Sequence, residues 1–364
     1  MALFDSTEHR VAKLSLDGML SRTMLRLHAL IDQDPLPTHI SGFDPILMPM
    51  VDHIYHALHQ KTPSLTPYSN QFLRTFQDAF RLEMQQTSSL RAMVGFSGGK
   101  DSVTSAIECI HGFAKRPILF HVRGINPSYT SMEYDAAQKL AKILDLEMKV
   151  SDFKPFKGSV YMEHPLKDQI ILAAMIDYGV KIGIVNYTLG VESENTITKS
   201  NVKYNFSDSV EMFKSFGYWV KDLLPEYNFF WTVKNHSKSL KTICEYEDET
   251  GLELLSNTIS CLTPVRFQNM RRNQTMAKYG VDLIKNRCGV CWKCCVEYLN
   301  LVCLGREQPP NDQIIRHCFD RFKTSLPTAY GNGYLEKATD IEILNVAVDP
   351  NEIDNTPLRP YLGI

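Results

Sequence analysis

The residues with the clearest chemical meaning form one short string, Ser97-Gly98-Gly99-Lys100-Asp101-Ser102, directly after an apolar run. Two adjacent glycines let the backbone turn tightly and come close to a ligand. A helix that begins at this turn presents free amide N–H groups and the positive end of its dipole, which together bind phosphate. Ser97 and Ser102 add hydroxyl donors, and Lys100 adds a flexible positive charge. Asp101 is suited either to cap the helix or to hold Mg²⁺ between phosphate oxygens.

The spacing within this string separates it from two common nucleotide motifs. It lacks the Gly-x-x-x-x-Gly-Lys-Ser/Thr pattern of the phosphate loop of kinases and GTPases. It also lacks Gly-x-Gly-x-x-Gly, which makes dinucleotide binding a weak interpretation. An ordinary strand-to-helix turn with two glycines is the structural alternative, and the whole six-residue string disfavours it. We therefore predict a phosphate-binding loop of another type.

Cysteines form the second cluster of chemical interest. Cys288, Cys291, Cys294 and Cys295 fall within one short segment. Two thiolates with two residues between them can fold around one tetrahedral Zn²⁺, and a third on the next turn adds a ligand. Cys261 is the favoured fourth ligand and Cys295 the second choice, because a residue adjacent to Cys294 normally points elsewhere. Free, partly buried cysteines and an iron–sulfur cluster are the two alternatives.

The elements around the string must place it at the edge of a sheet. Apolar and amphipathic patterns predict strands at 92–96, 117–122, 147–150 and 182–189, and helices at 101–113, 131–144 and 165–178. This alternation is typical of an α/β fold with a doubly wound parallel sheet. Ligands of such sheets bind at the carboxyl ends of the strands, where the string lies.

We expect four segments along the chain. They are a helical N-terminal extension at 1–88, an ATP-binding domain at 89–235, a helical subdomain with the metal site at 236–330, and a tail at 331–364. The extension has helical patterns at 21–33, 46–60 and 68–84, and the subdomain has them at 237–249 and 312–323. After Gly190 the pattern is more irregular and helical.

Composition limits the class of protein. The chain has 364 residues, 44% hydrophobic and 22% charged, which suits a globular protein with a sizeable core. Its net charge of −2 disfavours a nucleic-acid partner without excluding a local basic patch. We find no apolar run of the roughly 18 residues needed to span a bilayer and no signal-peptide pattern at the start. We therefore expect a soluble, cytoplasmic protein with no membrane partner.

The six-residue string resembles the signature of the ATP pyrophosphatase (PP-loop) superfamily. That resemblance implies a loop that grips the β and γ phosphates, which leave together as pyrophosphate while AMP passes to a substrate oxygen. Residues 92–299 further resemble the 7-cyano-7-deazaguanine synthase family of this superfamily. The zinc ligands of that family match Cys261, Cys288, Cys291 and Cys294 in order, with a longer spacing after Cys261.

The same resemblance implies a substrate and its contacts. The carboxylate of 7-carboxy-7-deazaguanine would be adenylated by ATP, ammonia would displace AMP to give an amide, and a second activation would give a nitrile. Gly190 matches a Gly-Val segment near the nucleotide, and Lys167 and Asp168 stand where the family has arginine and asparagine. Asp208 suits the N1–H and amino edge of the deazaguanine, or equally the cap of a helix at 209–216.

Other functions stay open. Relatives of this synthase occur in bacterial antiviral gene clusters, where the activated carboxylate could pass to a protein amine, and the extension and Lys167-Asp168 fit such a changed acceptor. PP-loop enzymes that transfer sulfur to tRNA need a cysteine near the loop, but Cys109 has a pattern that favours packing. An adenylyl sulfate reductase-like enzyme and a non-catalytic, zinc-stabilised nucleotide-binding protein are further alternatives. The resemblance also implies a homodimer.

Overall fold

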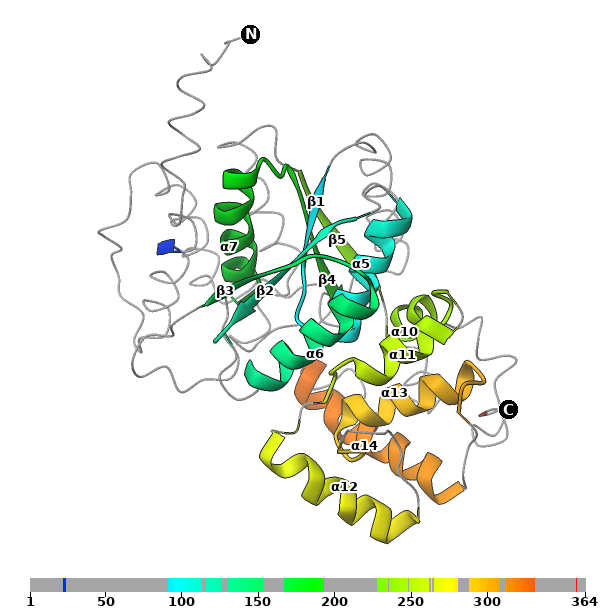
Figure 1. Cartoon of the computed structure of the whole chain (residues 1–364). Helices are drawn as coiled ribbons and strands as arrows, with labels where there is room; N and C mark the ends of the chain where they lie inside the picture. Colours follow the sequence, from blue (N-terminus) through cyan, green and yellow to red (C-terminus); the bar gives the residue numbers. More distant parts are fainter. Residues whose placement is uncertain are drawn as a thin grey trace, which may run out of the picture.

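The centre of the protein is a sheet of five parallel strands in the order β3-β2-β1-β4-β5 (Figure 1). The strands are β1 (Ala92–Gly95), β2 (Ile118–Arg123), β3 (Met148–Asp152), β4 (Asn186–Glu192) and β5 (Asn228–Lys234). The computed structural model describes residues 22–23, 91–112, 116–125, 130–152, 167–192, 228–234, 236–247, 249–261, 263, 265–280, 288–307, 312–330 and 358.

The winding of the chain reverses beside the central strand. From β1 the chain runs outward through β2 to β3, and it then returns to β4 on the other side of β1. In open α/β sheets, ligands bind in the crevice at such a reversal, beyond the carboxyl ends of the strands. The turn that follows β1 therefore lies at the position where this topology forms a site.

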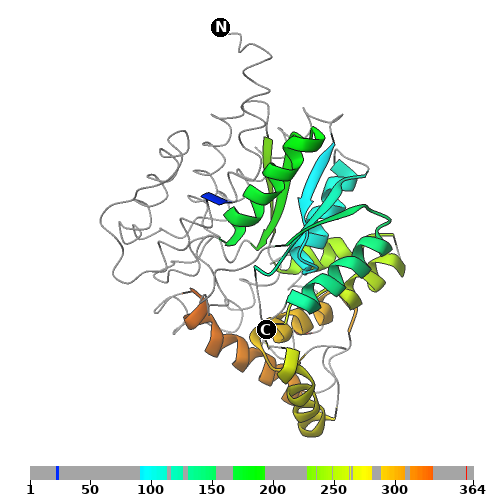
Figure 2. The same cartoon turned by 60° about the vertical axis from the view of Figure 1, so that its left-hand side comes forward.

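Helices cover both faces of the sheet. α5 (Lys100–Gly112) and α6 (Thr130–Ile143) lie on one face, and α7 (Lys167–Ile182) lies on the other (Figures 1 and 2). Ala92 and Val94 share a buried core with apolar residues of α5 and α6. All four residues of β1 are buried, as expected for a parallel strand covered on both sides. These observations confirm the prediction of a doubly wound α/β sheet.

A helical part follows the sheet. It comprises α10 (His236–Cys244), α11 (Glu249–Asn257), α12 (Val265–Tyr279), α13 (Trp292–Cys303) and α14 (Asp312–Tyr330). The helices α13 and α14 pack through a cluster that includes Leu299, Val302 and Ile315. Ile243 and Leu254 instead join the core of α5 and α6, so α10 and α11 pack directly on the sheet domain. The division of the chain into four segments stays a prediction.

The structure corrects two parts of the secondary-structure prediction. The irregular and helical pattern expected after Gly190 is wrong at Asn228–Lys234, which forms β5 beside β4. The single helix predicted at 237–249 is two helices, because the backbone turns after Cys244 and Glu247 has a positive φ of 43°. α7 also continues to Ile182, so β4 begins later than predicted.

Several predictions lie outside the described residues. Of the helices predicted in the N-terminal extension, the structure describes only Arg22 and Thr23, which are helical. Asp208 and all of the tail except Leu358 also lie outside. Among the described helices, none is both long enough and apolar enough to cross a membrane.

Candidate functional site

The turn between β1 and α5 is ordered by its own polar groups. Gly98 has a φ of 84°, a backbone conformation that residues with a side chain rarely adopt. The Ser97 hydroxyl oxygen accepts a 3.2 Å hydrogen bond from the amide N–H of Gly99. The Ser102 hydroxyl donates a 2.8 Å hydrogen bond to the Gly99 carbonyl oxygen and lies 3.4 Å from the Ser97 hydroxyl. The two predicted serine donors therefore lie side by side at the start of α5.

Lys100 is buried and paired with the neighbouring carboxylate. Its side chain is 1% exposed, and Nζ lies 2.9 and 3.0 Å from the two carboxylate oxygens of Asp101. The Ser239 hydroxyl, from α10, donates a 3.3 Å hydrogen bond to Asp101 Oδ1. A buried ammonium needs such a partner, because burial alone would penalise its charge. Asp101 thus compensates the charge of Lys100 at the edge of the pocket.

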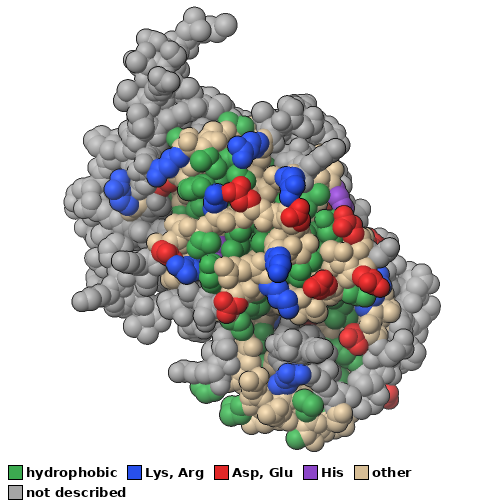
Figure 3. Space-filling model, in the orientation of Figure 1, with side chains coloured by type: hydrophobic (Ala, Val, Ile, Leu, Met, Phe, Trp, Pro, Cys, Tyr) green, Lys and Arg blue, Asp and Glu red, His purple; other side chains and the backbone are tan. Residues whose placement is uncertain are grey.

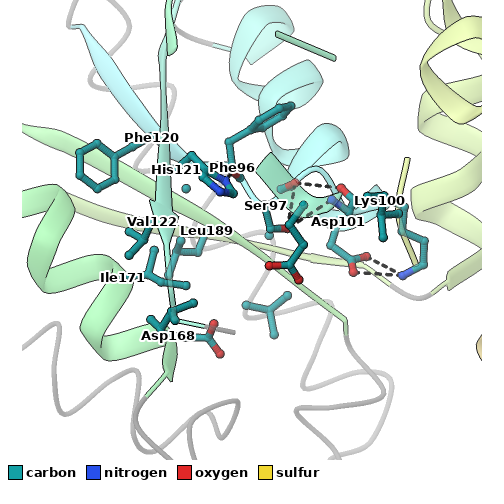
Figure 4. Close-up of a pocket in the computed structure, with 18 of the residues that line it drawn as sticks. Phe96, Ser97, Lys100, Asp101, Phe120, His121, Val122, Asp168, Ile171 and Leu189 are labelled. Atoms are coloured by element: carbon teal, nitrogen blue, oxygen red, sulfur yellow. Dashed lines mark hydrogen bonds and ion pairs between the residues drawn. The ribbon is translucent and has the colours of Figure 1, made fainter. Parts of the chain in front are cut away.

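One pocket collects most of the predicted site residues. Its lining includes Ser97, Gly99, Lys100, Asp101, Ser102, Asp168 and Gly190. Figure 4 shows Ser97, Lys100 and Asp101 on one side of the view, and Asp168 on the other side together with the apolar side chains of Val122 and Ile171. Gly98 belongs to the turn and not to this lining. Lys167 begins α7, its side chain is not described, and Asp208 lies outside the described residues.

Four further polar residues of the lining were not predicted from the sequence. They are His121, Glu133, Ser260 and Lys293. The signal for His121 was available, since it is the one polar residue before the last position of the apolar strand Ile118–Arg123. Ser260 and Lys293 reach the pocket from the helical part, far along the chain, and no local pattern marks them.

His121 has one ring nitrogen with a protein partner and one without. Nδ1 lies 2.8 Å from the carbonyl oxygen of Phe96, so Nδ1–H donates and Nε2 is left as an acceptor. Nε2 is buried and has no hydrogen-bond partner among the described residues. Burial lowers the pKa of His121 below its ordinary value and outweighs the opposing hydrogen bond to Phe96. The imidazole of His121 is therefore neutral, and its Nε2 can accept a hydrogen bond from a ligand.

The four cysteines predicted as metal ligands meet at one point. The sulfur atoms of Cys261, Cys288, Cys291 and Cys294 all lie within 4.8 Å of one another. The Sγ–Sγ distances are 4.0 Å for Cys261 and Cys291, 3.9 Å for Cys288 and Cys294, and 3.4 Å for Cys291 and Cys294. Cys295 instead packs in the cluster between α13 and α14. The structure therefore selects Cys261 over Cys295 as the fourth member.

This donor set fits a single tetrahedral ion. Zn–S bonds of about 2.3 Å place thiolates at tetrahedron corners roughly 3.8 Å apart, close to the separations found here. A four-iron cluster would stand between the sulfurs and hold them much farther apart. Hydrogen bonds within the group lower the pKa of Cys288 and raise the pKa of Cys291 and of Cys294, so Cys288 reaches the thiolate that a metal requires before those two. Zn²⁺ held by these four residues would fix the surrounding chain segments.

Cys109 plays the packing role that its sequence pattern favours. It is 1% exposed, lies in the core between β1, α5 and α6, and is absent from the described pocket lining. Burial raises the pKa of its thiol, which makes the thiolate unfavourable. Cys109 is therefore unsuited to act as a nucleophile in sulfur transfer.

Comparison with known proteins gives no family assignment. No family model matches the sequence, and no curated protein matches it. Among solved structures, a match is the "U34-tRNA thiolase NcsA from Methanococcus maripaludis with its [4Fe-4S] cluster". It is 16% identical, covers 60% of this chain and 82% of that chain, and has a TM-score of 0.34. A score this low does not establish a common fold, so no property of the thiolase is transferred to this chain.

Proposed function

We propose that this protein binds ATP in the pocket beyond β1 and β4 and cleaves it between the α and β phosphates to adenylate a substrate. The observation that carries this proposal is that five residues of the string 97–102 line one pocket at the reversal of the sheet. The superfamily resemblance of that string supports pyrophosphate, rather than phosphate, as the leaving group.

The turn supplies the groups that a triphosphate needs. The first amide N–H groups of α5 and the hydroxyls of Ser97 and Ser102 are suited to bind phosphate oxygens. Lys100 can contribute positive charge as negative charge builds up on the leaving pyrophosphate. Asp101 is placed beside this charge and is suited to help hold Mg²⁺, which would bridge phosphate oxygens.

We further propose that the acceptor is the carboxylate of 7-carboxy-7-deazaguanine. An oxygen of that carboxylate forms a bond to the α phosphorus of ATP, the bond to the β-phosphate oxygen breaks, and pyrophosphate leaves. An amine then attacks the acyl carbon, and AMP leaves with the bonding electron pair. The amine is ammonia or a protein amine, and the product is an amide, a nitrile after a second activation, or a protein conjugate.

Asp168 supports a deazaguanine as the acceptor. Its half-buried carboxylate, in the first turn of α7, lines the pocket that also holds the phosphate turn. A carboxylate accepts hydrogen bonds from the N1–H and amino group of a guanine-like edge. Val122, Ile171 and Leu189 supply apolar surface for a flat ring nearby.

Sulfur transfer to tRNA through the same adenylate is the main alternative. The described residues that line the pocket include no cysteine, and Cys109 is buried elsewhere. On the face shown in Figure 3, basic and acidic side chains are interspersed over the described residues. A tRNA-binding surface would gather basic side chains. These observations favour a small acceptor.

An acceptor-dependence assay tests the proposal. The purified protein is incubated with ATP and Mg²⁺ alone, with 7-carboxy-7-deazaguanine, or with unmodified tRNA and a sulfur donor, and AMP is quantified. We expect AMP release to rise at least tenfold when the deazaguanine and ammonia are both present, and the mass of the deazapurine to shift to that of the amide or nitrile. Dependence on tRNA instead would replace the proposed acceptor.

A further inference from the structure

Two chain segments connect the cysteine cluster to the pocket beside the turn of residues 97–102. Ser260, which lines the pocket, immediately precedes the metal-site residue Cys261. Lys293, which also lines the pocket, lies between Cys291 and Cys294. Both segments that carry the four sulfur ligands therefore also deliver a polar side chain to the candidate ATP site.

The first of these segments is bonded to the turn itself. The amide N–H of Ile259 donates a 2.9 Å hydrogen bond to the carbonyl oxygen of Gly98. A Cβ atom at Gly99 would lie 3.2 Å from the carbonyl oxygen of Ile259, so glycine lets the two backbones approach. Two residues later, Cys261 reaches the metal centre. An ion at that centre would hold this segment against the turn.

The second segment begins helix α13 in an unusual way. Cys291 is its N-cap residue, yet it makes no side-chain capping hydrogen bond. Helices commonly begin at a serine, threonine, asparagine or aspartate whose side chain caps the first turn. Here the Cys291 sulfur instead lies with those of Cys261 and Cys294. Metal ligands on both sides of Lys293 would fix the backbone from which that side chain extends.

The charged side chains of the pocket include two lysines. Lys100 and Lys293 are the cations among the described lining residues, and they share the lining with Asp101, Glu133 and Asp168. Ser260 adds a buried hydroxyl oxygen with no hydrogen-bond partner in the described part of the chain. A triphosphate is highly charged and takes several donors, so both side chains match its chemistry.

We propose that the metal centre positions Lys293 and Ser260 as a second set of triphosphate contacts, alongside the turn of residues 97–102. Lys293 Nζ and Ser260 Oγ donate to phosphate oxygens of ATP, and the ion has no direct contact with the nucleotide. The inference rests on the proposed ATP site, but it does not depend on which acceptor is adenylated or on turnover.

Nucleotide binding by Lys293→Met tests the contact. Affinities for a non-hydrolysable ATP analogue and for AMP are measured by calorimetry on the full-length, metal-loaded protein. Loss of a charged hydrogen bond predicts roughly 10- to 100-fold weaker binding of the ATP analogue, with AMP changed less than twofold. Lys278→Met, at an exposed position of α12, is the control and should match the wild type. Equal losses for the ATP analogue and AMP would overturn the proposed triphosphate contact.

Removal of the metal tests the positioning. We expect metal-depleted wild-type protein to bind the ATP analogue at least as weakly as loaded Lys293→Met. Depletion of the variant should cause only the smaller further loss that comes from Ser260. Hydrogen exchange should rise in peptides covering 96–103 and 257–263 on depletion and return with Zn²⁺. Fully additive losses, or unchanged exchange at 96–103, would contradict the proposal. Failure of wild-type protein to bind the ATP analogue would remove the ATP site itself.

Discussion

The backbone of Gly190 touches the backbone of Asp101 so closely that a Cβ atom at residue 190 would lie 2.1 Å from the Asp101 carbonyl oxygen. This contact brings β4 against the first turn of α5 and closes one wall of the pocket. The glycine that the resemblance placed near the nucleotide is therefore required by the packing of strand against helix.

Gly190→Ala should disturb the pocket and the fold together. The methyl group must push the start of α5 away from β4, and overpacking of this kind costs about 1–3 kcal/mol. We expect a lower melting temperature and weaker binding of an ATP analogue. Gly183→Ala is the control, because that glycine has a positive φ but open space around it. It should lower stability without affecting nucleotide affinity; parallel losses of affinity in both variants would contradict the role given to residue 190.

Lys100→Met should abolish most of the activity. The charge of Lys100 stabilises the leaving pyrophosphate in the proposed reaction, and removal of one such group typically costs roughly 10²- to 10³-fold in rate. AMP formation under saturating ATP measures the effect, and circular dichroism checks that the sheet persists. Activity within threefold of the wild type would exclude Lys100 from the reaction.

Asp168→Asn should weaken binding of the acceptor substrate without changing binding of ATP. The amide keeps the shape of the side chain but replaces one acceptor oxygen by an NH₂ donor. That donor cannot accept a hydrogen bond from the N1–H or the amino group of the deazaguanine. We expect the KM for 7-carboxy-7-deazaguanine to rise about tenfold, the cost of roughly one hydrogen bond. The KM for ATP in the same assay is the internal control. An equal rise in both constants would place Asp168 at the nucleotide instead.

Cys261→Ser should release the metal. Loss of one of four thiolates opens the tetrahedral site, so elemental analysis should find about one Zn²⁺ per chain in the wild type and much less in the variant. Cys295→Ser is the matched control, because Cys295 is buried beside α14 outside the sulfur cluster. Iron with a visible absorption band in the wild type would contradict the single-ion assignment.

His121 should make the free energy of unfolding depend on pH. Its folded-state pKa is lowered by burial, below the 6.5 ordinary for histidine. Below about pH 6.5 the unfolded chain therefore binds more protons than the folded one, and stability falls as the pH decreases through the folded-state pKa. Urea unfolding of wild type and His121→Gln between pH 7.5 and 5 measures this; the wild type should lose more stability. His317, whose pKa is also lowered, is present in both proteins and cancels.

The sheet and the turn of residues 97–102 were predictable because their sequence signals are local. A buried apolar strand, a Gly-Gly pair and a helix start follow one another within about a dozen residues around Gly98. The break between α10 and α11 was missed because Glu247, not glycine, adopts the positive φ there. In β5, three consecutive aromatic residues are flanked by polar ones, with no alternation of polar and apolar positions, and only pairing with β4 identifies the strand.

The rest of the site depends on contacts that no local pattern carries. The cysteine spacing indicated a metal site, but not that residues next to the cysteines line the same pocket as the turn of residues 97–102. That relation follows from the hydrogen bond between Ile259 and Gly98 and from the lining positions of Ser260 and Lys293.

The position of ATP cleavage tests the central claim most directly. The purified protein is incubated with ATP, Mg²⁺, 7-carboxy-7-deazaguanine and ammonia, which is needed to release AMP from the adenylate, and the phosphorus products are followed by ³¹P NMR, with Lys100→Met as the control. Our account predicts AMP and pyrophosphate in equal amounts from the wild type and almost none from the variant. ADP and inorganic phosphate as the products would contradict cleavage between the α and β phosphates and, with it, the proposed adenylation.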